Sequence, residues 1–264
     1  MPAPNAQVTI AITNFKGGVG KSLLTHLLAA EFAAQGHRAQ IFDTDPQQST
    51  TRWYVLSKQR GYKLDDIAVF SASGTLEPDQ PSVDKGATLE LSSTTLKARL
   101  ADLPPCDVLL IDVGGYWSEE AVLLYSLCDA ILIPVVNEAT SATQAIEVGK
   151  VLQNIARATG RTIPYRAIFN SVTHINQNSM AMMETLAELK AAKFPIAKPF
   201  LTVRDWYARV GAGYGTLYEW QEAIRNDATL RPWQKKRMMQ PIEAAIDGVK
   251  VINNEVVAML EQSI

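Results

Sequence analysis

The sequence predicts an α/β protein with a mostly parallel, twisted sheet and helices on both of its faces. Short apolar runs alternate with segments of helical spacing along most of the chain. The runs are continuously apolar, which is typical of parallel strands buried on both faces. The 264 residues, 47% of them hydrophobic, are enough for one sizeable core. We expect a single domain over 1–264, with a mostly helical C-terminal part from about residue 200.

The first part of the chain alternates strands and helices. The expected strands, each a short run rich in β-formers, are 7–13, 39–43 and 66–70. The expected helices are 21–36 and 49–59. The first helix repeats leucines at helical spacing and is ended by Gly36. Residues 71–90 are polar and rich in Ser, Gly, Pro and Asp, so we expect a loop there.

The alternation continues beyond this loop. The expected strands are 107–112, 130–136 and 165–170. The expected helices are 92–102 and 140–160, and the pattern after Pro199 is mostly helical. In open parallel sheets the loops at the C-terminal ends of strands carry function. We therefore expect the functional residues at these strand ends.

Composition excludes several classes of protein. No run of about eighteen apolar residues occurs, so no membrane-spanning segment is expected. The segment "MPAPNAQ" does not resemble a signal peptide. Two scattered cysteines indicate a reduced, cytoplasmic setting rather than a disulfide scaffold. The net charge of -2 does not by itself indicate a nucleic-acid binder, but it leaves room for a local basic patch.

The stretch "NFKGGVGKS", residues 14–22, follows the first strand and opens the first helix. Glycines let backbone N–H groups turn inward around phosphate oxygens, and the helix N-terminus favours an anion. Lys21 is expected on the β- and γ-phosphates, and Ser22 on Mg²⁺. The usual spacing of a phosphate-binding loop would require glycine at position 15, which is Phe15, and position 16 carries a second lysine.

This stretch resembles the deviant Walker A motif of the ParA/MinD family of P-loop ATPases. The resemblance implies that ATP is held by Lys16, Gly17, Gly18, Val19, Gly20, Lys21, Ser22 and Leu23. It implies that Lys16 is the signature lysine, which reaches the partner's phosphates across an ATP-dependent homodimer. A cation supplied in this way stabilises charge on the transferred phosphoryl group, as an arginine finger does.

Acidic residues follow the second strand in "IFDTDPQQST". This segment resembles the family's D-x-D-P-Q motif, which implies that Asp45 polarises the attacking water. Asp43 then supports either the Mg²⁺ shell or the loop. Taken alone, the segment is also compatible with a helix cap, with Asp45 before Pro46.

A third acidic strand end lies in "DVLLIDVGG". Four apolar residues lead to Asp112, the Walker B arrangement, which holds Mg²⁺ through water. The family usually continues D-x-P-P, whereas this chain has Gly114 and Gly115. Glycines leave the main chain freer here, although the Gly114 N–H can still approach the γ-phosphate.

The nucleotide base is expected on later loops. Asn170 matches a position where the family often places an asparagine against adenine, and its amide suits an adenine edge. A turn residue at a strand end is the alternative for Asn170. The segment "KPFLTVRDWYARVGAGYGTLYEW" resembles a late family segment, which implies that Pro199 contacts the base or ribose.

The resemblance implies a slow ATPase that works as a switch. ParA-like members bind DNA without sequence preference as ATP-bound dimers, and a ParB-like or cargo-adaptor protein stimulates hydrolysis. MinD-like members instead bind membrane through a basic amphipathic helix. The C-terminal segment has only Lys250 as a cation, so we expect a packed helix and no membrane partner.

A basic patch is the candidate DNA-binding surface. Its members are Arg204, Arg209, Arg231, Lys235, Lys236 and Arg237. Cations of this kind neutralise phosphates, and a dimer doubles their number. The first strand begins near residue 7, so we expect no helix-turn-helix before it and no operator-specific binding. The expected function is partition of plasmid or chromosomal DNA on the nucleoid, with positioning of a protein cluster or organelle as the alternative.

Three other classes of protein are alternatives to this function. A reductase resembling the nitrogenase iron protein needs a cysteine soon after Asp112, but Cys128 lies beyond a helix. A biotin-pathway synthetase usually lacks the lysine present here as Lys16. A nucleotide-gated scaffold with little hydrolysis remains open, and turnover measured with and without DNA distinguishes it from an ATPase.

Overall fold

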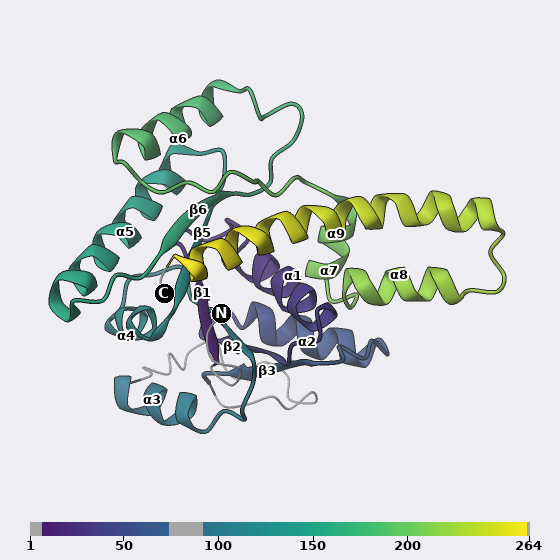
Figure 1. Ribbon diagram of the computed structural model, residues 1–264, viewed down its shortest axis with the longest axis horizontal. Coiled ribbons are helices and arrows are strands. Elements are labelled where there is room, and N and C mark those ends of the chain that lie inside the picture. The colour runs from purple at the N-terminus through teal and green to yellow at the C-terminus, as the bar shows by residue number, and fades with distance from the viewer. Residues whose placement is uncertain (1–6, 74–91, 263–264) are drawn as a thin grey trace.

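The structure is a computed structural model that describes residues 7–73 and 92–262 (Figure 1). Within these residues the chain forms one sheet of six parallel strands in the order β3-β2-β4-β1-β5-β6. The strands are β1 (Val8–Ile12), β2 (Ala39–Asp43), β3 (Ile67–Ser71), β4 (Val108–Asp112), β5 (Ala130–Val135) and β6 (Tyr165–Phe169). The predicted α/β class and parallel sheet are confirmed.

Helices cover both faces of this sheet. One face carries α1 (Lys21–Ala34), α2 (Ser49–Gln59), α7 (Asp205–Gly211), α8 (Leu217–Asn226) and α9 (Pro232–Glu261). The other carries α3 (Ser93–Ala101), α4 (Glu119–Leu127), α5 (Ala139–Thr159) and α6 (Met180–Ala191). The predicted helices all occur, within a residue or two of the expected bounds. The structure adds α6, which the sequence analysis did not propose.

Alternate residues of each strand face opposite cores. Ile10 and Ile12 of β1 pack with α1 and α9, whereas Ala11 between them packs with α4 and α5. Leu110 of β4 faces the first core, and Ile111 faces the second. Burial on both faces explains why these strands are continuously apolar in sequence.

The strand order reverses at β1. From β1 the chain passes to β2 and β3 on one side, and after β4 it crosses to β5 and β6 on the other. Ile12 at the end of β1 is in register with Asp112 of β4, and Asp112 is in register with Asp43 of β2. The loops that carry the predicted motifs therefore meet at one edge of the sheet, at the point where α/β proteins usually bind ligands.

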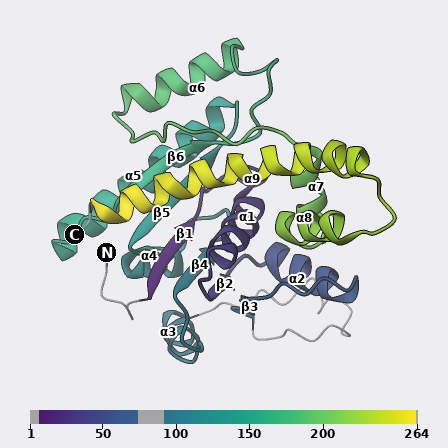
Figure 2. The same ribbon diagram turned by 45° about the vertical axis from the view of Figure 1, so that its right-hand side comes forward.

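Helices α8 and α9 form a hairpin that extends beyond the sheet (Figures 1 and 2). Helix α8 begins with a capping box in which Thr216 and Glu219 satisfy each other's backbone N–H groups. Helix α9 begins with Pro232 at its first turn, and its later part packs on α1 through residues such as Ile246, Val249 and Val256. The predicted packed C-terminal helix is confirmed.

One expected strand is displaced by a residue, and one expected loop falls largely outside the described residues. The strand expected at 66–70 lies one residue later, because Asp66 adopts a left-handed conformation with φ of 61°. Of the polar segment predicted as a loop over 71–90, the part from residue 74 onward lies outside the described residues. In the described part of the chain, every helix is too short or too polar to cross a membrane.

Candidate nucleotide-binding site

Asn14 anchors the start of the glycine-rich loop. Its side chain is fully buried, and its Nδ2 donates to the carbonyl oxygens of Pro134 at 2.9 Å and Ser141 at 3.3 Å. Its Oδ1 accepts a 2.9 Å hydrogen bond from the backbone N–H of Lys16. The loop is therefore tied to the end of β5 and the start of α5 without any ligand.

Two glycines give this loop its shape. Gly18 and Gly20 have φ angles of 76° and 89°, in the region that favours glycine. A Cβ atom at Gly20 would lie 2.0 Å from Nδ2 of Asn170. Gly17 and Gly18 are exposed, whereas Val19 is fully buried. The loop thus presents its glycine backbone to solvent while Val19 holds it to the body of the protein.

The Lys21 side chain folds back into the loop. It is buried, and its Nζ donates to the carbonyl oxygen of Lys16 at 3.1 Å. Burial lowers the pKa of Lys21, while the nearby carboxylates of Asp112 and Asp45 raise it. An anion in the loop would supply the counter-charge that this buried ammonium otherwise takes from more distant groups.

The Lys16 ammonium points to the start of α5 instead. It forms an ion pair with Glu138 and donates to Oγ1 of Thr140 at 2.6 Å. Glu138 is the residue that precedes α5, and its side chain is 60% exposed. In this single chain the Lys16 ammonium is therefore paired with an exposed carboxylate, whereas the Lys21 ammonium lies inside the loop.

Asp112 lies at the centre of the site and is fully buried. Its Oδ2 accepts a 2.7 Å hydrogen bond from Thr50, whereas its Oδ1 has no hydrogen-bond partner among the described residues. Burial raises the pKa of this carboxyl, Asp43 raises it further, and hydrogen bonds from Ser22 and Thr50 lower it. A buried carboxylate with one open oxygen beside a serine hydroxyl fits Mg²⁺, which prefers oxygen ligands and retains several waters.

The two acidic residues after β2 have different surroundings. Both carboxylate oxygens of Asp43 are used, because Oδ1 accepts from the N–H of Asp45 and Oδ2 accepts from the N–H and the hydroxyl of Thr51. Of the two roles expected for Asp43, these contacts favour support of the loop over a place in the Mg²⁺ shell. Asp45 is half-buried and accepts one 2.9 Å hydrogen bond from the N–H of Gln47.

The segment after β4 lies directly on the glycine-rich loop. A Cβ atom at Gly115 would lie 3.1 Å from Nζ of Lys21 and 3.4 Å from the backbone nitrogen of Gly17. At Gly114 a Cβ atom would meet the Tyr116 ring at 2.5 Å. Close approach therefore explains the two glycines where the family usually has prolines. The Gly115 position, rather than Gly114, lies against the lysine.

Asn170 and Pro199 reach the same edge of the sheet. The backbone N–H of Leu201 donates to Phe169 at 2.8 Å, so the segment after Pro199 runs along the end of β6. The Asn170 amide, however, donates to the carbonyl oxygen of Val19 at 2.8 Å. In this structure Asn170 supports the phosphate loop, and its contact with adenine stays a prediction. Leu23 is half-buried near Gly211 of α7.

The predicted basic patch divides into two groups. Arg204 is half-buried before α7, and the Arg209 guanidinium lies over the rings of Trp206 and Trp220, at 5.4 and 5.7 Å from their centroids. The remaining members, Arg231, Lys235, Lys236 and Arg237, lie at the N-terminal end of α9. The six residues therefore do not form one continuous cluster along a single helix.

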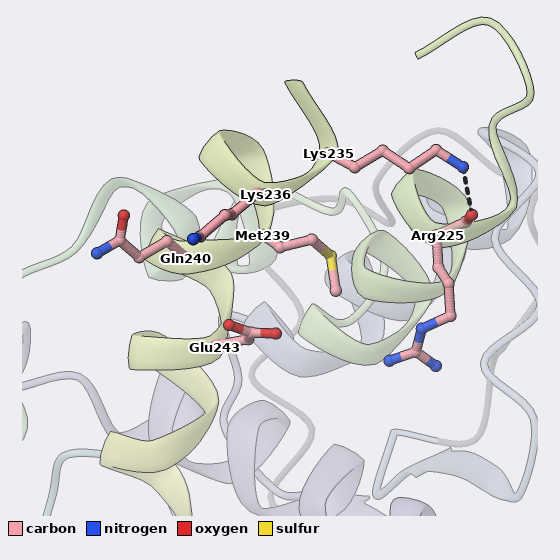
Figure 3. A pocket seen from close by; sticks show the side chains of 6 residues that line it. All are labelled: Arg225, Lys235, Lys236, Met239, Gln240 and Glu243. Atoms are coloured by element: carbon pink, nitrogen blue, oxygen red, sulfur yellow. Dashed lines mark hydrogen bonds between the residues drawn. The ribbon is translucent and has the colours of Figure 1, made fainter. Parts of the chain in front are cut away.

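A hollow of about 390 Å³ lies between α8 and α9 beside this second group (Figure 3). Lys235 reaches across to α8 and donates to the carbonyl oxygen of Arg225 at 2.7 Å, which fixes its ammonium (Figure 3). Lys236 and Glu243 also line the hollow. Arg231 and Arg237 are exposed. The hairpin end thus carries cations from both helices.

Some site residues were missed by the sequence analysis. Glu138 follows a predicted strand end, so the position alone could have drawn attention to it. Thr50 and His26, which are linked to Asp112, lie within predicted helices and carry no local signal of a site. Across the described residues, no group of three or more His, Cys, Asp or Glu side chains forms a metal cluster.

A glycine-rich loop between β1 and α1, with a lysine folded into it and a buried aspartate on the neighbouring strand, defines a P-loop nucleotide-binding protein. The profile of the CobQ/CobB/MinD/ParA nucleotide binding domain matches residues 10–208. The chain therefore belongs to this ParA/MinD family, as the resemblance of its motifs implied.

Curated relatives include partition proteins. The chromosome-partitioning ATPase Soj of Thermus thermophilus is 30% identical over 135 residues, which are 48% of this chain and 53% of that protein. Protein ParA of Rhizobium radiobacter is 25% identical over 166 residues, 62% of this chain and 64% of that protein. The chain thus matches between half and two thirds of the length of these relatives.

Solved structures share the fold. The apo form of McdA from Cyanothece superposes with a TM-score of 0.60 at 19% identity, covering 92% of this chain and all of that one. The ATP complex of an aspartate-to-alanine variant of that protein gives a TM-score of 0.58 at 17% identity, covering 92% of this chain and 96% of that one. At this level of identity the similarity concerns the fold.

Proposed function

We propose that the chain is a single-domain ATPase that hydrolyses ATP to ADP and phosphate and uses the two nucleotide states as a switch. The observation that carries this proposal is the preformed loop around the Lys21 ammonium, which lies beside the buried Asp112 carboxylate with its open oxygen. Membership of the ParA/MinD family and the ATP complex of the McdA structure support it.

Each residue of the site has a distinct task in this proposal. The N–H groups of the glycine loop and the Lys21 ammonium neutralise the phosphate oxygens. Ser22 and Asp112 hold Mg²⁺, which neutralises charge on the β- and γ-phosphates when bound. Asp45 orients the attacking water, because it is half-buried at the site and its carboxylate accepts only one hydrogen bond from the described residues. Phosphoryl transfer needs little more than such positioning.

Dimerisation completes the site. Lys16 lies at the edge of the loop and is held there by the exposed Glu138, so it is available to a partner only after this ion pair opens. In the proposed homodimer Lys16 contacts the phosphates bound by the partner subunit. Charge supplied in trans makes hydrolysis depend on dimer formation.

The ATP-bound dimer binds DNA without sequence preference through the end of the α8–α9 hairpin. The exposed cations at this end are Arg231, Lys236 and Arg237, and the hairpin that carries them extends beyond the sheet (Figures 1 and 2). Two such ends in a dimer give enough phosphate contacts for strong dependence on salt, since about six to ten contacts suffice. A ParB-like or cargo-adaptor partner that stimulates hydrolysis would release the DNA.

The test measures ATP hydrolysis, dimerisation and duplex binding together. We expect slow turnover, a dimer by light scattering with ATP but not with ADP, and binding to unrelated duplexes only in the ATP state. The Lys16→Ala variant, the control, should bind ATP but fail to hydrolyse it. ATP binding without any turnover, with or without DNA, would favour a nucleotide-gated scaffold. Dimerisation without DNA binding would favour positioning of a cargo by another surface.

A further inference from the structure

His26 of α1 is connected to the Mg²⁺ site through one side chain. Its Nε2 lies 2.8 Å from Oγ1 of Thr50, and the same oxygen donates to Oδ2 of Asp112 at 2.7 Å. The imidazole is 2% exposed and stacks on Trp53, with ring centroids 4.1 Å apart and planes 10° apart. Thr50 is fully buried. The three side chains thus form a hydrogen-bonded series that is closed to solvent.

The donors in this series can be assigned from their chemistry. The Thr50 hydroxyl has one proton, which it donates to Oδ2 of Asp112. The contact between Thr50 and His26 must then be donated by the imidazole, so Nε2 carries the proton. The second ring nitrogen, Nδ1, has no hydrogen-bond partner among the described residues. Burial lowers the pKa of His26 to about 3, so the ring is neutral near pH 7 and holds one N–H.

We infer that His26 is a positioning residue for the Mg²⁺ site. It acts through Thr50 to orient the Asp112 carboxylate so that Oδ2 accepts the Thr50 hydrogen bond and Oδ1 has no hydrogen-bond partner among the described residues. This inference rests on the proposed function, because it names a determinant of Mg²⁺ binding at that site. His26 fixes the Thr50 hydroxyl, and Thr50 fixes the carboxylate. Such outer partners orient metal ligands, and their loss typically costs about 10- to 100-fold in metal affinity or activity.

A purely structural role for His26 makes a different prediction. If the ring only fills the core against Trp53, any substitution that keeps the stacking should preserve the site. His26→Phe keeps an aromatic ring and removes the N–H donor, so it separates the two roles. Thr50→Val removes the hydroxyl and keeps the shape, whereas Thr50→Ser keeps the hydroxyl.

The experiment measures binding of a fluorescent ATP analogue while Mg²⁺ is titrated, on variants whose folding is checked by thermal unfolding. We expect His26→Phe and Thr50→Val each to raise the Mg²⁺ concentration for half-saturation by about tenfold, while Thr50→Ser stays near the wild type. The matched control is Thr185→Val, which removes an equally buried hydroxyl that donates to Ala181 within α6. This control should not shift the Mg²⁺ dependence.

A double variant tests whether the residues act in series. Because His26 acts only through Thr50, the combination of His26→Phe with Thr50→Val should be no worse than Thr50→Val alone. Additive effects, or wild-type Mg²⁺ dependence in folded His26→Phe, would overturn the inference while leaving the proposed function intact. A wild-type protein that binds no nucleotide with Mg²⁺ would overturn both.

A second measurement uses the free protein. The chain has three histidines, so nitrogen-15 spectra of the imidazoles can be assigned by substitution. We expect His26 in the form protonated at Nε2. Protonation at Nδ1 instead would contradict the assigned direction of the hydrogen bonds and would overturn the inference, whatever the titrations show.

Discussion

The phosphate loop and the end of the α8–α9 hairpin both carry cations, but they hold them in different ways. In the loop, Lys21 is buried against a carbonyl oxygen and a buried asparagine fixes the backbone around it. At the hairpin end, Lys236 and Arg237 are exposed, and a hollow of about 390 Å³ lies beside them (Figure 3). We therefore expect ligand binding in the loop to depend on geometry, and ligand binding at the hairpin end to depend on the number of charges.

This difference determines how each region responds to substitution. A geometric site fails when a single group is removed, because neighbouring groups cannot move to replace it. A charged surface loses affinity gradually, because each cation contributes a similar, salt-dependent increment. Single substitutions should therefore have large effects in the loop and small effects in the hairpin.

The largest effect is expected for Lys21→Ala. Hydrogen bonds to charged groups are worth about 1.5–3 kcal/mol each, and the ammonium can make more than one, so ATP affinity should fall by about 100-fold or more. Titration calorimetry measures this directly, with Lys58→Ala on α2 as a remote control. Unaltered affinity in Lys21→Ala would remove the loop from the nucleotide site.

The next largest effect is expected for Asp45→Ala. Loss of a group that positions the attacking water should lower kcat by roughly 100-fold, while the ATP-bound dimer still forms. Phosphate release and light scattering measure the two properties separately. Wild-type turnover in this variant would exclude Asp45 from the reaction, and loss of dimerisation would assign it to the interface instead.

Local pattern was enough to predict the loop and the strands that lead to it. Glycine spacing, apolar runs and acidic strand ends are all read within a few consecutive residues. Helix α6 was not predicted because most of its residues are exposed or half-buried, with only Thr185 and Leu189 buried, so it has no strong apolar stripe. The ion pair of Lys16 with Glu138 joins residues 122 positions apart, and no local pattern contains such a contact.

The same limit applies within the site. The Asn170 amide was predicted to contact adenine; in this structure it donates one hydrogen bond to the carbonyl oxygen of Val19, and the contact with adenine stays a prediction. Asp43 was predicted to support either Mg²⁺ or the loop; its contacts with Thr51 favour the loop, and both roles stay predictions. Motifs indicate which residues meet at a site. The partner of each polar atom depends on the packing of the whole sheet.

A smaller effect is expected when charge is reversed at Lys235, Lys236 and Arg237. Replacing all three by Glu should weaken binding to any duplex by about tenfold near 0.1 M salt and reduce the salt slope by up to about 3 per chain. The matched control reverses Lys97, Lys150 and Lys190, which lie on helices of the opposite face of the sheet. An equal loss in the control would show that net charge, rather than the hairpin end, determines DNA binding.

The smallest effect is expected for Glu138→Ala, and its sign is opposite. Removal of this carboxylate frees Lys16 from its ion pair, so less ATP should be needed for half-maximal dimerisation. Exposed ion pairs are worth about 0–1 kcal/mol, which limits the change to about fivefold.

Glu138 makes no side-chain cap to α5, so the helix should keep its stability. Glu147→Ala, which removes an ion pair with Lys150 on the same helix, is the control. A higher ATP requirement in Glu138→Ala would contradict this prediction. It would mean that the ion pair with Glu138 holds Lys16 in the position that the dimer needs.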